Sequence, residues 1–86
     1  MNINHLISIV KKKLESEIII EKIKIEDKSF LHKNHIGNQA NKYHLKIFLT
    51  SNELKNMKKI ESTKKVYKIL DYEIKNFIHS LQILIN

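Results

Sequence analysis

Five histidines are the side chains of this protein that could bind a metal ion. Three of them, His32, His35 and His44, lie in the stretch DKSFLHKNHIGNQANKYHLKIF, around the only glycine of the chain, while His5 and His79 lie near its two ends. A neutral imidazole is a common ligand of transition metals, and the chain has no cysteine that could supply a thiolate. Whether these histidines act as ligands depends on the elements that hold them.

Length and composition indicate one small globular domain over residues 1–86. The chain is 42% hydrophobic and 29% charged, and no segment approaches the roughly 20 apolar residues of a membrane span. The N-terminal residues lack the basic region and the small-residue cleavage site of a secretory signal. Because cysteine is absent, disulfides are excluded and a cytoplasmic location is the default. We expect a monomer when the protein is alone, and no membrane partner.

The net charge of +7 comes from lysine alone, since none of the 16 basic residues is arginine. Isoleucine and asparagine are also abundant, a bias typical of AT-rich codon use. A basic protein attracts anions whatever the origin of its charge. The charge by itself is therefore weak evidence for nucleic-acid binding.

The first half of the chain predicts one helix followed by two strands. Apolar residues recur at helical spacing near the N-terminus: Ile3, Leu6, Ile7, Val10 and Leu14. Asn2 or Asn4 is the expected N-cap. Alternating apolar residues then predict a strand from Ile18 to about Ser29 and a second strand over 42–50, paired as an antiparallel hairpin. The connection between them is longer than usual, which in a small domain tends to be functional or mobile.

The second half predicts two helices and a third strand. Thr50 and Glu53 have the spacing of a capping box ahead of a short helix. A turn near Glu61 and Ser62 should precede the next helix, whose apolar stripe is Val66, Leu70, Ile74 and Phe77. Alternation returns from His79, with four residues on one side of the strand: His79, Leu81, Ile83 and Ile85.

The element order α-β-β-α-α-β indicates an α+β fold, with a three-stranded mixed sheet and the helices on one face. The second strand reaches the third through a helical crossover, which favours parallel pairing of these two strands.

Taken together, these segments resemble the BolA-like protein family. DKSFLHKNHIGNQANKYHLKIFLTS is similar to the family's acidic residue, serine, loop histidine and "HF…V…S" strand, and TKKVYKIL…IHSLQI is similar to its third helix and "VHAL" strand. The resemblance extends from the first helix to Ile85. There are two departures: Ser62 and Thr63 stand where many members have the first two residues of "RHR", and the family's final helix has no counterpart before Asn86.

The resemblance implies a class II KH-like fold, iron–sulfur chemistry and regulatory roles. Family members bind monothiol glutaredoxins, and the pair can hold a [2Fe–2S] cluster to which the BolA-like subunit gives the "VHAL" histidine and a loop histidine or cysteine. The matching residues here are His79 and His32, with His35 as the alternate loop ligand. A glutaredoxin cysteine and glutathione would supply the thiolates. Because protons compete for histidine lone pairs, cluster transfer should weaken below about pH 6.5. Members are also described as transcriptional regulators.

Without the resemblance, His79 would be interpreted as a polar residue at the start of a strand, either hydrogen-bonded or solvated. His44 falls on the solvent-facing side of the second predicted strand, which suggests a structural or partner-facing role. His5 occupies a helix position with no signal beyond solvation.

A second candidate surface is rich in lysine. The run KNMKKIESTKKVYK places several lysines at the junction of the two later helices: Lys55, Lys58, Lys59, Lys64, Lys65 and Lys68. This surface could be a solvated face, a docking site for an acidic glutaredoxin surface bearing glutathione, or a contact for DNA phosphates. The Gly-x-x-Gly loop of nucleic-acid-binding KH domains needs two glycines, and this chain has one.

The sequence contains no recognised nucleophile or phosphate-loop motif, so we expect a binding module rather than an enzyme. Three functions remain open: an adaptor that shares a cluster with glutaredoxin, a DNA-binding transcriptional regulator, or an adaptor that contacts a protein partner without metal.

Overall fold

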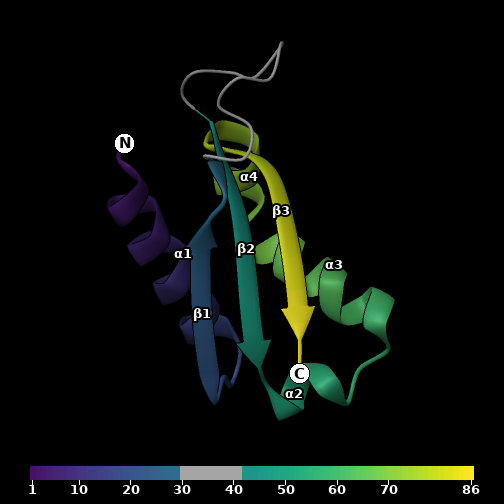
Figure 1. Ribbon diagram of the computed structural model, residues 1–86. Coiled ribbons are helices and arrows are strands. Elements are labelled where there is room, and N and C mark those ends of the chain that lie inside the picture. Colours follow the sequence, from purple (N-terminus) through teal and green to yellow (C-terminus); the bar gives the residue numbers. More distant parts are fainter. Residues whose placement is uncertain (30–41) are drawn as a thin grey trace.

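The computed structural model describes residues 1–29 and 42–86, which form four helices and a three-stranded sheet (Figure 1). In chain order the elements are α1 (Ile3–Glu17), β1 (Lys22–Asp27), β2 (Tyr43–Thr50), α2 (Asn52–Lys55), α3 (Lys59–Ile69), α4 (Asp71–Asn76) and β3 (Ile78–Ile85). Figure 1 shows α1, α3 and α4 behind the sheet and α2 at the end where β2 finishes. On the face of the sheet toward the viewer, which we call the open face, none of the helices of residues 1–29 and 42–86 is packed.

The sheet is mixed, as expected. β1 pairs with β2 in antiparallel orientation, and β2 pairs with β3 in parallel orientation, so β2 is the central strand. The predicted α+β fold class is therefore confirmed. None of the helices in the described ranges is long and apolar enough to cross a membrane.

The core lies between the sheet and the helices. Every second residue of β2 points into it, where Leu45, Ile47 and Leu49 are at most 2% exposed. The helical spacing of Leu6, Val10 and Leu14 brings one face of α1 onto the same cluster. Further buried apolar residues come from the other elements: Ile18, Leu54, Val66, Leu70 and Ile78.

Local hydrogen bonds fix the two ends of α1. Asn2 is the N-cap, because its side-chain oxygen accepts a hydrogen bond from the backbone N–H of His5 at 2.8 Å. At the other end the N–H of Ile18 donates to the carbonyl of Leu14 at 2.9 Å. Ile18 thus closes the helix, and β1 begins at Lys22, later than alternation alone predicts.

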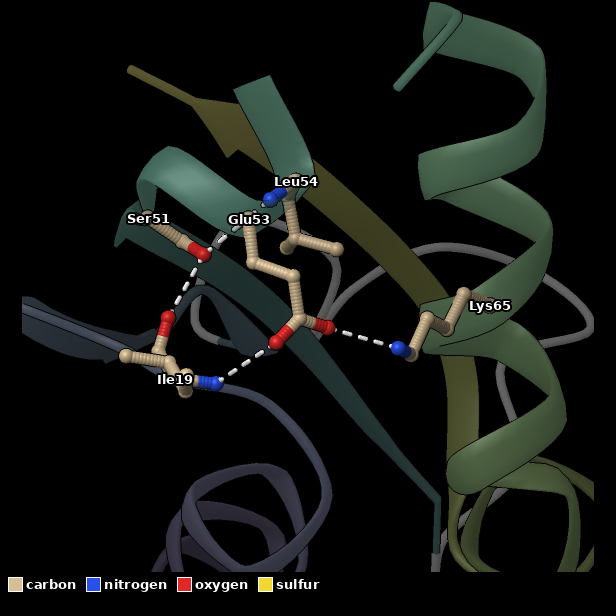
Figure 2. A network of polar contacts seen from close by, with 5 residues as sticks. All are labelled: Ile19, Ser51, Glu53, Leu54 and Lys65. Atoms are coloured by element: carbon tan, nitrogen blue, oxygen red, sulfur yellow. Dashed lines mark hydrogen bonds and ion pairs between the residues drawn. The ribbon is translucent and has the colours of Figure 1, made fainter. Parts of the chain in front are cut away.

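The expected capping box at Thr50 is wrong by one residue. Thr50 is the last residue of β2, and Ser51 is the N-cap of α2, whose Oγ accepts a hydrogen bond from the N–H of Leu54 at 3.2 Å. The Ser51 hydroxyl also donates to the carbonyl of Ile19 at 2.7 Å. Figure 2 shows that Glu53 turns away from the cap and accepts hydrogen bonds from the N–H of Ile19 and from Lys65. The network joins the chain before β1 to α2 and α3.

The later helices also begin and end differently from the prediction. The expected turn near Glu61 and Ser62 lies inside α3, and the break between α2 and α3 falls at 56–58. The apolar stripe that predicted one helix up to Phe77 is divided at Leu70, which has φ −97° and ψ 15° and is fully buried. Leu70 therefore belongs to the core at the point where α3 ends and α4 begins.

Candidate functional site

A β-bulge at the start of β3 determines where His79 lies. Tyr43 of β2 is paired with Ile78, but the next residue, His44, is paired with Ser80, so His79 is an extra residue in β3. The bulge lets Ile78 enter the core while the ring of His79 contacts the ring of His44. The prediction that His79 shares one side of the strand with the three core-facing residues after it is therefore wrong.

His44 is the buried member of this histidine pair. Only 4% of His44 is exposed, although it lies on the open face of the sheet, so the expectation of a solvent-facing side chain is wrong. Its Nδ1 lies 2.6 Å from the Oγ of Ser80. The backbone of His44 is held as well, because its N–H donates to Ser29 Oγ at 3.1 Å and its carbonyl accepts from the N–H of Lys28 at 2.7 Å.

His79 is the exposed member of the pair. The two ring centroids are 5.0 Å apart and the ring planes are inclined by 60°. His79 is exposed to solvent, whereas His44 and Ser80 are bonded to each other beside it. The arrangement therefore presents one accessible imidazole supported by a second, buried one.

The histidine pair alone is not a complete metal site. Within residues 1–29 and 42–86, no group of three or more His, Cys, Asp or Glu side chains is arranged to hold a metal ion. His32 and His35, the two candidate loop ligands, lie outside the described residues. His5 lies exposed on α1. The structure therefore brings His79 together with His44, for which the sequence suggested a structural or partner-facing role rather than cluster ligation.

Five of the six lysines predicted at the lysine-rich junction are exposed, and the sixth forms an ion pair. Lys55, Lys58, Lys59, Lys64 and Lys68 are exposed. Lys65 is half-buried, and its Nζ lies 2.6 Å from a carboxylate oxygen of Glu53. The hydrogen bond from Lys65, together with that from the backbone of Ile19, lowers the pKa of Glu53 below its ordinary value of 4.5. Lys65 therefore stabilises the junction and is less available to a partner than its exposed neighbours.

Comparison with known proteins identifies the family. The profile of the BolA-like protein family matches residues 14–86. The chain belongs to this family. A relative from Haemophilus influenzae named "DNA-binding transcriptional regulator BolA" is 29% identical over 73 residues, which cover 85% of this chain and 68% of the relative.

Solved structures show the same fold. The structure of BolA1 from Arabidopsis thaliana has a TM-score of 0.79 and 24% identity, covering 93% of this chain and 88% of its own. The BolA domain of SufE1 from the same plant has a TM-score of 0.77 and 23% identity, covering 92% and 87%. The predicted BolA-like fold is therefore confirmed.

The two positions at which this BolA-like chain departs from the "RHR" motif lie in the first half of α3. Ser62 is 2% exposed, and its hydroxyl donates to the carbonyl of Lys59 at 2.9 Å. Thr63 is half-buried and lines a groove beside the end of β3. In this member the two side chains are small and uncharged, so they add no charge to the lysine surface around them.

His44 could have been singled out from the family resemblance. In the segment YHLKIFLTS it occupies the place of the histidine in the "HF" strand of BolA-like proteins. Its position in the alternation placed it on the open face, but its contacts with Ser80 and His79 come from a strand far along the sequence. No local pattern in the sequence reports such contacts.

Proposed function

We propose that this BolA-like protein is an adaptor that binds a monothiol glutaredoxin and contributes His79 to a shared [2Fe–2S] cluster, in iron–sulfur trafficking or iron sensing. The observation that carries the proposal is the exposed imidazole of His79. It contacts the buried ring of His44 at the end of the sheet where β2 and β3 begin to pair.

The donor set fits a shared cluster better than a resident one. The chain has no cysteine, and its described part holds no three-residue metal site. An exposed imidazole can still coordinate one iron while thiolates come from a partner and from glutathione. The thiolates that a partner and glutathione supply would give such a cluster ligands that this chain does not contain, which is a reason for the complex.

The second ligand from this chain is His32 in the proposal, with His35 as the alternate. Ser29, whose Oγ accepts from the N–H of His44, precedes His32 by three residues. A chain of that length spans at most about 11 Å, so the proposal asks for no long reach along the chain between Ser29 and the second ligand. We assign His44 to positioning, because its Nδ1 contacts Ser80.

Affinity capture tests this function against the alternatives. The tagged protein is used under anaerobic conditions to capture partners from native lysate, and the eluate is analysed for protein identity and iron. A monothiol glutaredoxin with iron supports the proposal, and the same partner without iron supports an adaptor that acts without metal. Capture of neither the glutaredoxin nor iron would contradict both.

A second candidate function is DNA-binding transcriptional regulation through the exposed lysines of the junction. It is supported by the name of the Haemophilus influenzae relative, a DNA-binding transcriptional regulator, and by the lysine surface. Such binding should be salt-dependent and stronger for a target promoter than for random DNA. Equal affinity for promoter and random DNA would show that the binding is only attraction between a basic protein and a polyanion.

A further inference from the structure

An aromatic ring flanked by lysines occupies the open face of the sheet, away from the histidine pair. The strand register places Lys24, Phe48 and Leu84 side by side across the three strands on this face. In Figure 1 the helices of the described part of the chain all lie away from this side of the sheet. Phe48 follows His44 by four residues of β2, so the two positions are about 13 Å apart.

Two ammonium groups lie over Phe48. The Nζ of Lys46 is 5.0 Å from the ring centroid and the Nζ of Lys24 is 5.7 Å from it. The Lys24 side chain is 70% exposed, and besides its contact with the ring it makes a 3.4 Å ion pair with Glu26. Exposed cation–π and ion-pair contacts are weak, so both long side chains can turn from the ring to an incoming anion.

The apolar row continues into a groove at the end of β3. Phe48 and Leu84 line this groove of about 460 Å³ together with Lys55 and Lys59 from the lysine-rich junction. Leu84 is 37% exposed. The aromatic ring and the lysine surface are therefore parts of one continuous surface.

The free edge of β3 is less suited to pairing with another strand. β3 is an edge strand, but the hydroxyl of Tyr67 donates to the carbonyl of Leu81 at 3.1 Å. A peptide adding a strand there would have to displace this bond and pass the tyrosine side chain. This contact favours a ligand that lies across the open face rather than one that extends the sheet.

Charge and shape select the class of ligand. On the open face of the described strands the basic residues are Lys22, Lys24 and Lys46, and the only acid is Glu26. A polyanion with accessible flat rings matches both the lysines and Phe48. Single-stranded nucleic acid has this chemistry, whereas the bases of a duplex are stacked on each other.

We propose that the open face binds single-stranded nucleic acid, with a base stacked on Phe48, Lys24 and Lys46 on the flanking phosphates, and the strand continuing over Leu84 toward Lys55 and Lys59. This activity goes beyond the proposed cluster sharing and does not depend on it.

Fluorescence anisotropy with a labelled single-stranded DNA of mixed sequence, about 12 nucleotides long, tests the proposal. Single strands should bind more tightly than the duplex of the same sequence. Phe48→Leu, which keeps an apolar side chain, should weaken binding of the single strand about tenfold. The double variant Lys24→Gln/Lys46→Gln should lower the slope of log affinity against log salt by about 1.4, the value for two lost phosphate contacts.

The matched control is Lys11→Gln/Lys12→Gln, which removes the same charge from exposed positions on α1. Equal weakening by the two double variants, or displacement of the DNA by polyaspartate of equal charge, would identify general attraction of anions and overturn the proposal. Tighter binding of the duplex would also overturn it. If Phe48→Leu unfolds at a lower temperature than wild type, the comparison of the two double-lysine variants and the comparison of single strand with duplex still test the proposal. His79→Ala should leave this binding unchanged, so failure here is separate from failure of the cluster proposal.

Discussion

His44 and His79 pack with their ring centroids 5.0 Å apart, one buried and the other exposed. The pair exists because β3 has one extra residue at the point where it begins to pair with β2. The buried ring is fixed by Ser80, and the exposed ring is left accessible beside it. Different consequences follow from changing each of the two histidines.

Substituting the buried histidine should destabilise the fold. His44→Ala leaves a small cavity and removes the contact with Ser80, which together should lower the free energy of unfolding by about 1–3 kcal/mol. His79→Ala removes an exposed side chain and should change it by less than about 0.5 kcal/mol. Urea titrations of both variants measure the difference. Equal destabilisation would contradict the assignment of His44 as the supporting residue.

The ion pair between α1 and α4 should also contribute to stability. Lys13 Nζ lies 2.9 Å from a carboxylate oxygen of Glu73, whose side chain is only 4% exposed. Lys13→Met leaves this carboxylate without its cation and should cost about 1–3 kcal/mol. Urea unfolding is compared with that of Lys12→Met, a change at the exposed neighbouring position. If both variants unfold at the same urea concentration, the ion pair contributes nothing.

Ser51 rather than Thr50 should be sensitive to loss of its hydroxyl. Ser51→Ala removes the N-cap of α2 and the bond to the carbonyl of Ile19, at a cost of about 1–2 kcal/mol. Thr50→Val keeps a β-branched strand residue and should have a smaller effect. Thermal unfolding of the two variants ranks them. A larger effect at Thr50 would restore the capping box expected from the sequence.

The Glu53 network predicts a specific loss of stability in acid. Its pKa is lowered in the folded protein, chiefly by the hydrogen bond from Lys65, so protonation is disfavoured by folding. The resulting stability is present above the ordinary value of 4.5 and is lost as pH falls through and below it. Glu53→Gln should therefore be less stable than wild type at pH 7, with a difference that shrinks below pH 4.5.

Unfolding by urea across this pH range measures the Glu53 effect. Glu15→Gln is the control, because Glu15 is exposed on α1 and makes no ion pair within the described residues. A difference between Glu53→Gln and wild type that stays constant with pH would show that the carboxylate charge is not the cause.

The elements of this fold follow from local sequence patterns, whereas several of their ends do not. Alternation identified β2 because its inward residues are all hydrophobic: Tyr43, Leu45, Ile47 and Leu49. The spacing of Thr50 and Glu53 predicted a cap, but Thr50 is occupied in strand pairing with Lys22. The bulge at His79 has no glycine or proline to mark it, and one extra residue reverses the side that alternation predicts.

The candidate site was also predictable only in part, because some of its contacts depend on how the strands pair. The family resemblance indicated His79, and the structure places it accessibly on the open face. The support from His44 and Ser80, and the ring of Phe48 between two lysines, arise from neighbours on adjacent strands. Such neighbours are defined by strand register, which the sequence alone did not specify.

Anaerobic reconstitution with a monothiol glutaredoxin, iron, sulfide and glutathione tests the central claim most directly. Visible absorption and circular dichroism should show a cluster spectrum distinct from that of the glutaredoxin homodimer. The distinct spectrum should disappear with His79→Ala and persist with His5→Ala, a change at an exposed histidine on α1. An unaltered spectrum with His79→Ala would contradict the role of His79 as a ligand.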